Sequence, residues 1–202
     1  FTEDILLELA YIKRTILNST KNQDIRDFCL ITMSSIIRAV SNADDNCTRT
    51  VVRKKLNKKI YPSFALTKFA ENLILYSYRI NDFSNNISGN HYVEIPNNCD
   101  ARYNEYPDNS FDLAITSPPY VNAVDYPRTH QLEMYWLDMI DGSLSQLKEK
   151  HIGTEVVKAV DYKELHKIGD KDADIIIEKI YQIDKRRAYI AYKYLYDMLL
   201  NM

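Results

Sequence analysis

The stretch Phe111-Asp-Leu-Ala-Ile-Thr-Ser-Pro-Pro-Tyr120 decides which fold the sequence predicts. Residues 111–116 form an apolar run that is typical of an inner strand of a parallel sheet. Ser117-Pro-Pro-Tyr120 follows at once, and open α/β sheets bind their ligands at the carboxyl ends of their strands. The stretch therefore predicts a buried strand that leads into a functional loop. The alternative is that these four residues are only a stiff turn.

The residue types of this loop suit one chemical task, the binding of an exocyclic amine on adenine or cytosine. The lone pair of that amine is conjugated into the ring, so an enzyme must place acceptors on both N–H groups. The Ser117 oxygen and the Pro118 carbonyl are the candidate acceptors, while Pro118 and Pro119 hold φ at about −65°. Tyr120 is expected to stack on a base that has left the duplex. We predict that these four residues are catalytic and act by positioning and electrostatics.

The residues around the loop resemble one family. Asn98–Tyr120 is similar to the part of DNA amino-methyltransferases in which a Gly-Asp loop precedes a catalytic (Asp/Asn/Ser)-Pro-Pro-(Tyr/Phe) loop. Val121–Arg128 resembles the continuation in members that carry Thr-Ser-Pro-Pro-Tyr, and His151–Glu155 resembles a further, weaker segment. The resemblance is specific over about residues 97–137. It implies S-adenosylmethionine as methyl donor, double-stranded DNA as substrate, and Ser117–Tyr120 as the amine-binding loop.

The resemblance implies further roles. Ser117 favours N4 of cytosine over N6 of adenine, because members with Thr-Ser-Pro-Pro-Tyr are mostly cytosine-N4 enzymes. Asp100 stands where the family has the Asp of its Gly-Asp loop, which implies a contact with the adenosine end of the cofactor. Asp125, Tyr126 and Arg128 are expected to contact the target or flanking nucleotides, and the alternative is a salt-bridged loop. A restriction–modification role with a partner nuclease and a solitary methylase role both fit.

Two departures from the family pattern concern the cofactor. Only four glycines occur, and no Phe-x-Gly-x-Gly loop is present to grip the methionine part of S-adenosylmethionine. Cys99 also replaces the glycine of the Gly-Asp loop. Because the sequence begins with Phe1 inside a helical pattern, we expect a fragment of a longer methyltransferase that is inactive alone.

The predicted fold is α/β, a partial Rossmann-like class I methyltransferase sheet with a largely helical N-terminal part. Residues 1–90 are expected to be helical and to serve as an insertion or DNA-recognition part, because apolar residues recur there at three-to-four residue spacing. The first helix is expected to bury one face, made by Ile5, Leu6, Leu9, Ile12, Ile16 and Leu17. A second helix is expected to carry Phe28, Ile31, Ile36, Ile37 and Val40 on its apolar face. Residues 91–202 are expected to form the partial catalytic region, with strands at 91–95 and 111–116 and helices at the C-terminus. Residues 142–153 are expected to be irregular. The C-terminal tyrosines Tyr189, Tyr192, Tyr194 and Tyr196 recur at helical spacing and are expected to be core and rim residues, the alternative being base stacking.

Composition excludes several classes. The net charge of −2 is not that of a protein that binds nucleic acid by charge alone, so DNA contacts must be local. No apolar run is long enough for a membrane span. The three cysteines lie far apart without metal-ligand spacing, which predicts no metal site and reduced thiols in a cytoplasmic protein.

Two other functions remain open at this point. The basic segment 49–59 favours a non-catalytic DNA-binding or specificity module, in which its lysines and arginines contact phosphates; the alternative for the segment is a solvated helix face. The third interpretation is a helical interaction domain in which the Pro-Pro turn is incidental.

Overall fold

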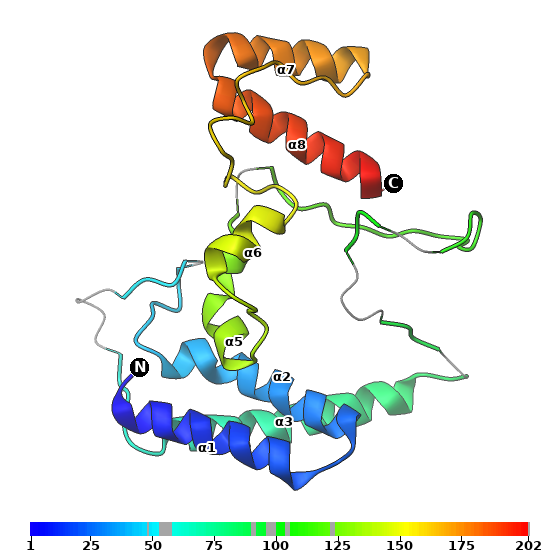
Figure 1. Ribbon diagram of the computed structural model, residues 1–202. Coiled ribbons are helices and arrows are strands. Elements are labelled where there is room, and N and C mark those ends of the chain that lie inside the picture. The colour runs from blue at the N-terminus through cyan, green and yellow to red at the C-terminus, as the bar shows by residue number, and fades with distance from the viewer. Residues whose placement is uncertain are drawn as a thin grey trace. The chain divides into compact units, whose positions relative to one another are not determined.

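The structure is a computed structural model and describes residues 1–47, 49–52, 58–89, 92–95, 100–103, 106–121 and 124–201. Within these ranges the chain forms helices and connecting segments and no β-strand (Figure 1). It divides into two compact units, Phe1–Tyr92 with Arg128–Asp141, and Val93–Pro127 with Gly142–Met202. The predicted division into regions 1–90 and 91–202 stays a prediction. No described helix combines the length and the apolar character that a bilayer crossing requires.

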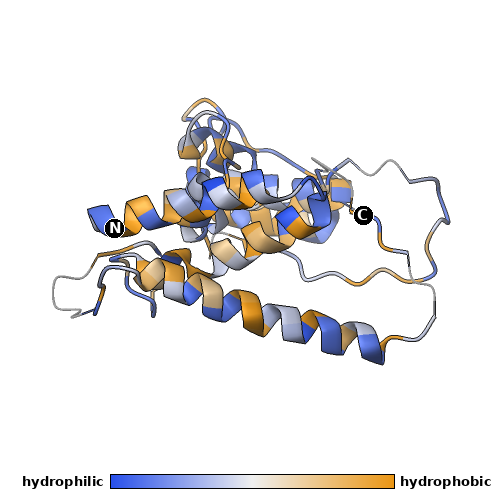
Figure 2. Cartoon of the chain, turned by 90° about the horizontal axis from the view of Figure 1, so that it is seen from below, coloured by the Kyte–Doolittle hydropathy of each residue, from blue (hydrophilic) through white to orange (hydrophobic). Residues whose placement is uncertain are grey.

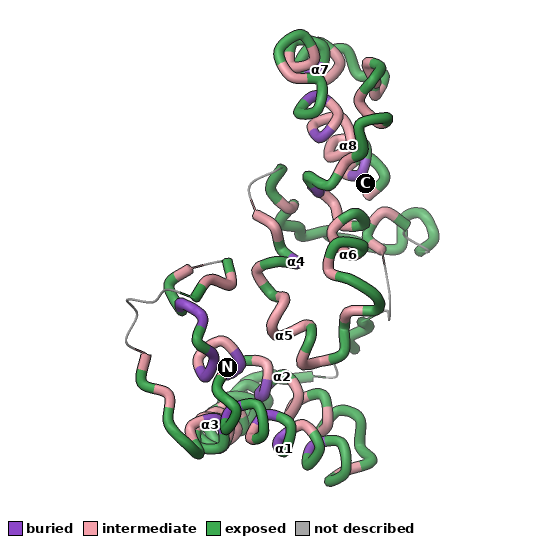
Figure 3. The backbone as a smooth tube through the Cα atoms, turned by 60° about the vertical axis from the view of Figure 1, so that its left-hand side comes forward, coloured by how far each residue is buried: buried purple, intermediate pink, exposed green. Residues whose placement is uncertain are grey.

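The first unit is built on three helices, α1 (Glu3–Ser19), α2 (Gln23–Val40) and α3 (Phe64–Asn86), which pack against one another (Figure 1). Apolar residues recur along each helix at helical spacing, so one face of each is hydrophobic (Figure 2). Figure 3 colours the buried positions of the backbone purple. The core residues that these faces bury are Ile5, Leu9, Ile12, Ile16, Met33, Ile36, Val40 and Ala65. The short helix α5 (Gln131–Trp136) packs on α2 and adds Trp136 to the edge of the core.

A side chain of α1 caps the N-terminus of α3. Ser63, the residue before α3, has φ of 70° and makes no side-chain cap hydrogen bond. The Glu8 carboxylate of α1 accepts instead from the backbone N–H groups of Ser63 at 2.5 Å, Ala65 at 2.8 Å and Leu66 at 3.2 Å. A carboxylate at this end satisfies unpaired N–H groups and is stabilised by the helix dipole. Glu8 therefore fixes α3 against α1.

The second unit contains α6 (Leu144–Lys150), α7 (Lys171–Ile183) and α8 (Lys185–Asn201). The short helix α4 (Tyr126–Thr129) crosses the boundary between the units. Helices α7 and α8 pack together, and Asp184 between them accepts from the backbone N–H of Arg187 at 3.0 Å, which begins α8. Asp170 begins α7 in the same way, accepting from Ala173 N–H at 2.9 Å.

The predicted α/β fold is wrong for the described residues. Residues 92–95 and 111–116 were expected to be strands, yet they pair with no strand, and Ile115 is 89% exposed where a buried side chain was expected. A strand is stable only when a neighbouring backbone satisfies its N–H and C=O groups, whereas an apolar pattern specifies side-chain preference alone. His91, the first residue of one expected strand, lies outside the described residues.

The helix predictions were more accurate. Of the face predicted to be buried in the first helix, Ile5, Leu9, Ile12 and Ile16 are buried, whereas Leu6 and Leu17 are exposed. The C-terminal region forms two helices. Ile31 was expected on the buried face of the second helix but is 65% exposed. Residues 142–153 were expected to be irregular, but they contain α6. The missed signal is its capping box, formed by Ser143 and Gln146.

Candidate functional site

The predicted amine-binding loop lies in the second unit, largely open to solvent. Ser117 and Pro118 are exposed, Pro119 is half-buried, and the Tyr120 side chain is 66% exposed. The Tyr194 hydroxyl of α8 donates a hydrogen bond of 2.9 Å to the Pro119 carbonyl. The loop thus presents its two candidate acceptors and its candidate stacking ring, while one of its carbonyls is held by a helix.

Gly153 lies against the next peptide of the loop. It is buried, its φ is 81°, and a Cβ atom there would stand 3.0 Å from the Tyr120 carbonyl oxygen and 3.7 Å from Cδ2 of Tyr194. A positive φ raises the conformational energy of a residue that has a Cβ atom. The distance of 3.0 Å to the Tyr120 carbonyl oxygen is also shorter than an ordinary van der Waals contact. Glycine at this position therefore allows the turn after α6 to approach the loop.

Asp100, the candidate cofactor residue, is engaged by its own neighbour. Arg102 donates to both Asp100 oxygens, at 2.9 Å from Nε and 2.5 Å from Nη2. Hydrogen bonding from Arg102 lowers the pKa of Asp100 to about 2, so the carboxylate is ionised at neutral pH. Arg102 also donates to the Lys150 carbonyl at 3.0 Å and pairs with Asp197 at 3.3 Å.

One face of α8 supports both predicted functional segments. Tyr194, Asp197 and Asn201 are three and four residues apart, so they lie on the same side of the helix. Tyr194 contacts the Pro119 carbonyl, Asp197 contacts Arg102, and the Asn201 amide donates to the Ala101 carbonyl at 2.7 Å. Asp197 is buried, and Lys193 neutralises it further at 2.9 Å. Helix α8 therefore holds the turn at residue 100 and the loop at residue 119 in place.

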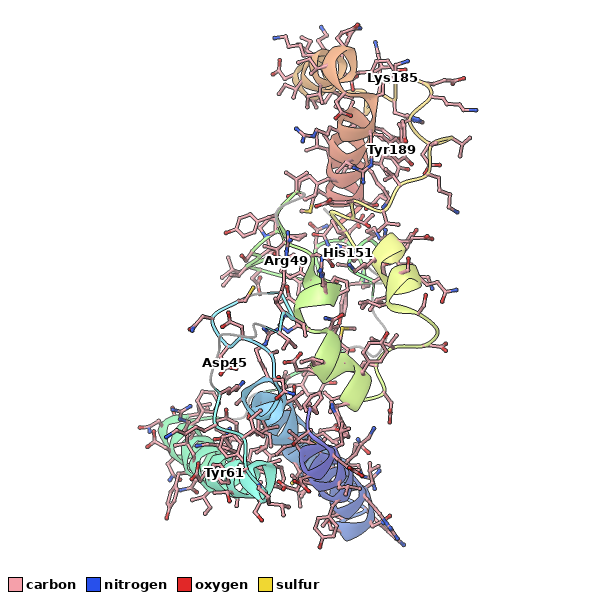
Figure 4. The ribbon with its side chains drawn as sticks, turned by 90° about the vertical axis from the view of Figure 1, so that its left-hand side faces the viewer. Asp45, Arg49, Tyr61, His151, Lys185 and Tyr189 are labelled. Carbon is pink, nitrogen blue, oxygen red and sulfur yellow. The ribbon has the colours of Figure 1, made fainter. Side chains whose placement is uncertain are left out.

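Sequence reasoning missed this role of α8. Its tyrosines were predicted to be core and rim residues, and Tyr189 (Figure 4) and Tyr192 do pack around His166, with the Tyr192 ring stacked on the imidazole at 4.9 Å. The spacing of Tyr194, Asp197 and Asn201 was the available signal, because three hydrogen-bonding side chains on one helix face need partners when that face packs on the unit.

The remaining candidate substrate residues differ in their surroundings. Asp125 forms an ion pair with Lys148 of α6, as in the alternative of a salt-bridged loop. The Tyr126 side chain is 36% exposed at the start of α4. Arg128 is exposed and belongs to the first unit. Their proposed contacts with nucleotides stay predictions.

Some basic side chains of segment 49–59 bind other parts of the first unit, and others are exposed to solvent. Lys58 donates to the carbonyls of Arg38 at 2.9 Å and Ala43 at 3.1 Å, and to Asp45 (Figure 4) at 2.8 Å. These bonds commit its ammonium group to the fold of the first unit. Arg49 and Lys59 are exposed, and residues 53–57 of the predicted strip lie outside the described residues.

The structure offers no candidate metal centre among the residues that it describes. His151 follows α6 (Figure 4), and its Nδ1 lies 2.8 Å from the Lys148 carbonyl. Burial lowers the pKa of His151, which favours the neutral imidazole. The pKa of the Cys29 thiol is raised by burial, so that cysteine is protonated; Cys99 lies outside the described residues.

The fit of these residues to S-adenosylmethionine is partial. A nucleoside cofactor needs acceptors for its ribose hydroxyls and a glycine turn that lets the backbone approach closely. Asp100 is an ionised acceptor, but both of its oxygens already accept from Arg102, and the four glycines form no such turn. Among the residues that the resemblance implies for the cofactor, the described part of the chain therefore offers one carboxylate, that of Asp100.

Comparison with known proteins finds two methyltransferases. The chain is 23% identical over 210 residues to the type II methyltransferase M.MvaI of Kocuria varians, covering 98% of this chain and 46% of that protein. It is 38% identical over 58 residues to the type II methyltransferase M.BsoBI of Geobacillus stearothermophilus, covering 29% of this chain and 11% of that protein. The chain thus spans less than half of M.MvaI and a small part of M.BsoBI.

No family model matches the sequence. No solved structure matches it. By these two matches the chain is similar to type II methyltransferases.

Proposed function

We propose that this chain is part of a DNA methyltransferase that methylates the exocyclic amine of a flipped base, with N4 of cytosine favoured over N6 of adenine. The observation that carries the proposal is the loop Ser117–Tyr120, whose residue types suit amine binding and which is open to solvent. The similarity to two type II methyltransferases supports methyl transfer as the reaction class. Because the chain covers less than half of either relative, the activity belongs to the whole protein.

In this proposal the loop binds the target amine through two acceptors. The Ser117 hydroxyl oxygen accepts one N–H and the Pro118 carbonyl accepts the other, which draws the nitrogen toward a pyramidal geometry. Both residues are exposed, so a base that has left the duplex can reach them. Tyr120 stacks on the face of that base. The amine gains a methyl group and loses one proton, and no covalent enzyme intermediate forms.

S-adenosylmethionine supplies the electrophilic methyl group when it is bound. Asp100 is the residue of this chain that we propose to face its adenosine end, and Arg102 keeps that carboxylate ionised. Asp125, Tyr126 and Arg128 are proposed to contact the target or flanking nucleotides. Double-stranded DNA is then the substrate, and a nuclease of the same specificity is the partner if the protein serves restriction–modification.

The test is methyl transfer from radiolabelled S-adenosylmethionine to DNA by the full-length protein. Ser117→Ala and Tyr120→Ala are each expected to lower the rate by orders of magnitude, because each removes one contact to the base. Tyr120→Phe keeps the ring and is expected to retain most of the rate. Ser110→Ala and Tyr103→Ala are the matched controls, since both residues are exposed in the same unit. Wild-type rates in Ser117→Ala and Tyr120→Ala would refute the proposal.

A helical interaction domain is the second candidate function. It is favoured by the absence of strands among the described residues and by apolar side chains that α3 leaves exposed, chiefly Ile74, Tyr78 and Phe83. Large exposed apolar groups often mark binding surfaces. This candidate predicts that Ser117→Ala has no effect on any activity of the protein, so the same methylation assay separates the two functions.

A further inference from the structure

We propose that Tyr194 of α8 is a positioning residue for the loop Ser117–Tyr120, setting the direction in which Tyr120 faces the bound base. The observation is the hydrogen bond of 2.9 Å from the Tyr194 hydroxyl to the Pro119 carbonyl. The inference rests on the proposed function, because the loop matters only if it holds the target amine.

The chemistry of proline shows why this carbonyl is the one that needs a tertiary contact. Ser117 and Pro118 each precede a proline, which restricts both to extended backbone conformations. The rings of Pro118 and Pro119 also fix φ at both positions. The ψ angle of Pro119 has no such restriction, because Tyr120 follows it. The local sequence therefore orients the two amine acceptors but leaves the peptide that leads to Tyr120 free to rotate.

Tyr194 restrains that rotation. A hydrogen bond to the Pro119 carbonyl fixes the plane of the Pro119–Tyr120 peptide and hence the origin of the Tyr120 side chain. It also occupies one of the two lone pairs of the Pro119 carbonyl oxygen, which makes this oxygen a weaker competitor of the Pro118 carbonyl for the amine. Gly153 bounds the next peptide, since a Cβ atom there would stand 3.0 Å from the Tyr120 carbonyl oxygen. The two contacts come from different segments and confine both peptides that flank Tyr120.

Nuclear magnetic resonance tests the contact directly. Pro-Tyr occurs once in the sequence, at Pro119-Tyr120. Labelling proline with ¹³C at the carbonyl and tyrosine with ¹⁵N in the full chain therefore gives one cross-peak that correlates the Pro119 carbonyl with the Tyr120 amide. Tyr194→Phe removes only the hydroxyl and is expected to move this cross-peak. Tyr196→Phe is the matched control, because Tyr196 is an exposed tyrosine of the same helix that stacks on Tyr192.

Kinetics of the full-length protein test the consequence. Tyr194→Phe is expected to lower kcat roughly tenfold, equal to about 1.4 kcal/mol of barrier, with less change in KM for DNA. Tyr196→Phe is expected to keep the wild-type kcat. Gly153→Ala is expected to lower kcat as well, whereas Gly169→Ala is not. Gly169 also has positive φ, at 99°, but a Cβ atom there meets nothing within 4 Å, so it controls for backbone strain.

The outcomes separate the inference from the proposed function. An unmoved cross-peak in Tyr194→Phe overturns the inference whatever the activity. A moved cross-peak with wild-type kcat, in a protein that Ser117→Ala inactivates, overturns the positioning role and leaves the proposed function intact. A wild-type rate in Ser117→Ala removes the proposed function and the positioning role with it. A moved cross-peak together with a lower kcat, both absent in Tyr196→Phe, supports the inference.

Discussion

Replacing Arg102 by Ala tests how the turn at residue 100 is held on α8. The Arg102 side chain is 16% exposed and its partner Asp197 is 7% exposed, so their ion pair is largely shielded from water. Breaking a buried ion pair costs about 3–5 kcal/mol when a charge is left alone. Lys193 still neutralises Asp197 in the variant, and Asp100 is partly exposed and reaches water. We therefore expect Arg102→Ala to lower the free energy of unfolding by about 2–3 kcal/mol at pH 7.

The loss of unfolding free energy in Arg102→Ala is expected to become smaller as the pH falls. Arg102 lowers the pKa of Asp100 from 3.8 to about 2, which corresponds to about 2.4 kcal/mol at 1.36 kcal/mol per pKa unit. Because the Asp100 side chain is 38% exposed, solvent screening reduces the contribution to about 1 kcal/mol. A carboxylate with a lowered pKa stabilises the fold above its unfolded pKa, and this stabilisation is lost as the pH falls through the folded pKa. The difference between wild type and variant should therefore narrow by about 1 kcal/mol between pH 5 and pH 2.

Urea unfolding followed by circular dichroism at several pH values measures both quantities. Arg187→Ala is the control, because Arg187 is 74% exposed and pairs with Asp184 at 3.5 Å, and such pairs contribute about 0–1 kcal/mol. A loss below about 0.5 kcal/mol in Arg102→Ala, within the range of ordinary surface substitutions, would refute the role given to the arginine. A difference from wild type that stays constant between pH 5 and pH 2 would refute the assignment of the Asp100 pKa to Arg102.

Three further predictions concern the first unit, each measured by urea unfolding. Ile36→Ala is expected to cost about 2–5 kcal/mol because Ile36 is buried in the core, whereas Ile31→Ala on the exposed side of α2 is expected to cost less than about 0.5 kcal/mol. Glu8→Ala is expected to cost about 1–2 kcal/mol, because three backbone N–H groups at the start of α3 lose their acceptor; no change would mean that water replaces it. Lys58→Met is expected to lower the free energy of unfolding by about 2–3 kcal/mol, because two carbonyls and a carboxylate lose their hydrogen-bond donor. Lys59→Met is the control and is expected to be neutral, because Lys59 is exposed. If Lys58→Met weakens DNA binding by more kcal/mol than it lowers the free energy of unfolding, the phosphate-contacting strip is supported instead.

The helices were predictable because their periodicity is local. Ile5, Leu9, Ile12 and Ile16 define one face of α1 whatever packs against it, and that face is buried. The exposure of Ile31 was not predictable in this way, because several apolar residues of α2 compete for the buried side and the packing of α1 and α3 decides among them.

The predicted strand at residues 111–116 shows the opposite case. Its apolar pattern suits a buried strand, but strand formation depends on a partner that the segment itself does not specify. The loop that follows was identified from residue chemistry alone. The contacts that hold this loop could not be predicted in this way, because the hydrogen bond between Tyr194 and Pro119 joins residues far apart in the sequence. The role of Arg102 could not be predicted either, because its partners Asp197 and Lys150 are also distant in the sequence.

The most direct test of the central claim is mass spectrometry of nucleosides from DNA incubated with the full-length protein and S-adenosylmethionine. The proposed function predicts N4-methylcytosine, absent when Ser117→Ala replaces the wild type. N6-methyladenine would keep the reaction and overturn the choice of base. No methylated nucleoside from the folded, cofactor-supplied protein would contradict the claim that the loop Ser117–Tyr120 serves methyl transfer to DNA.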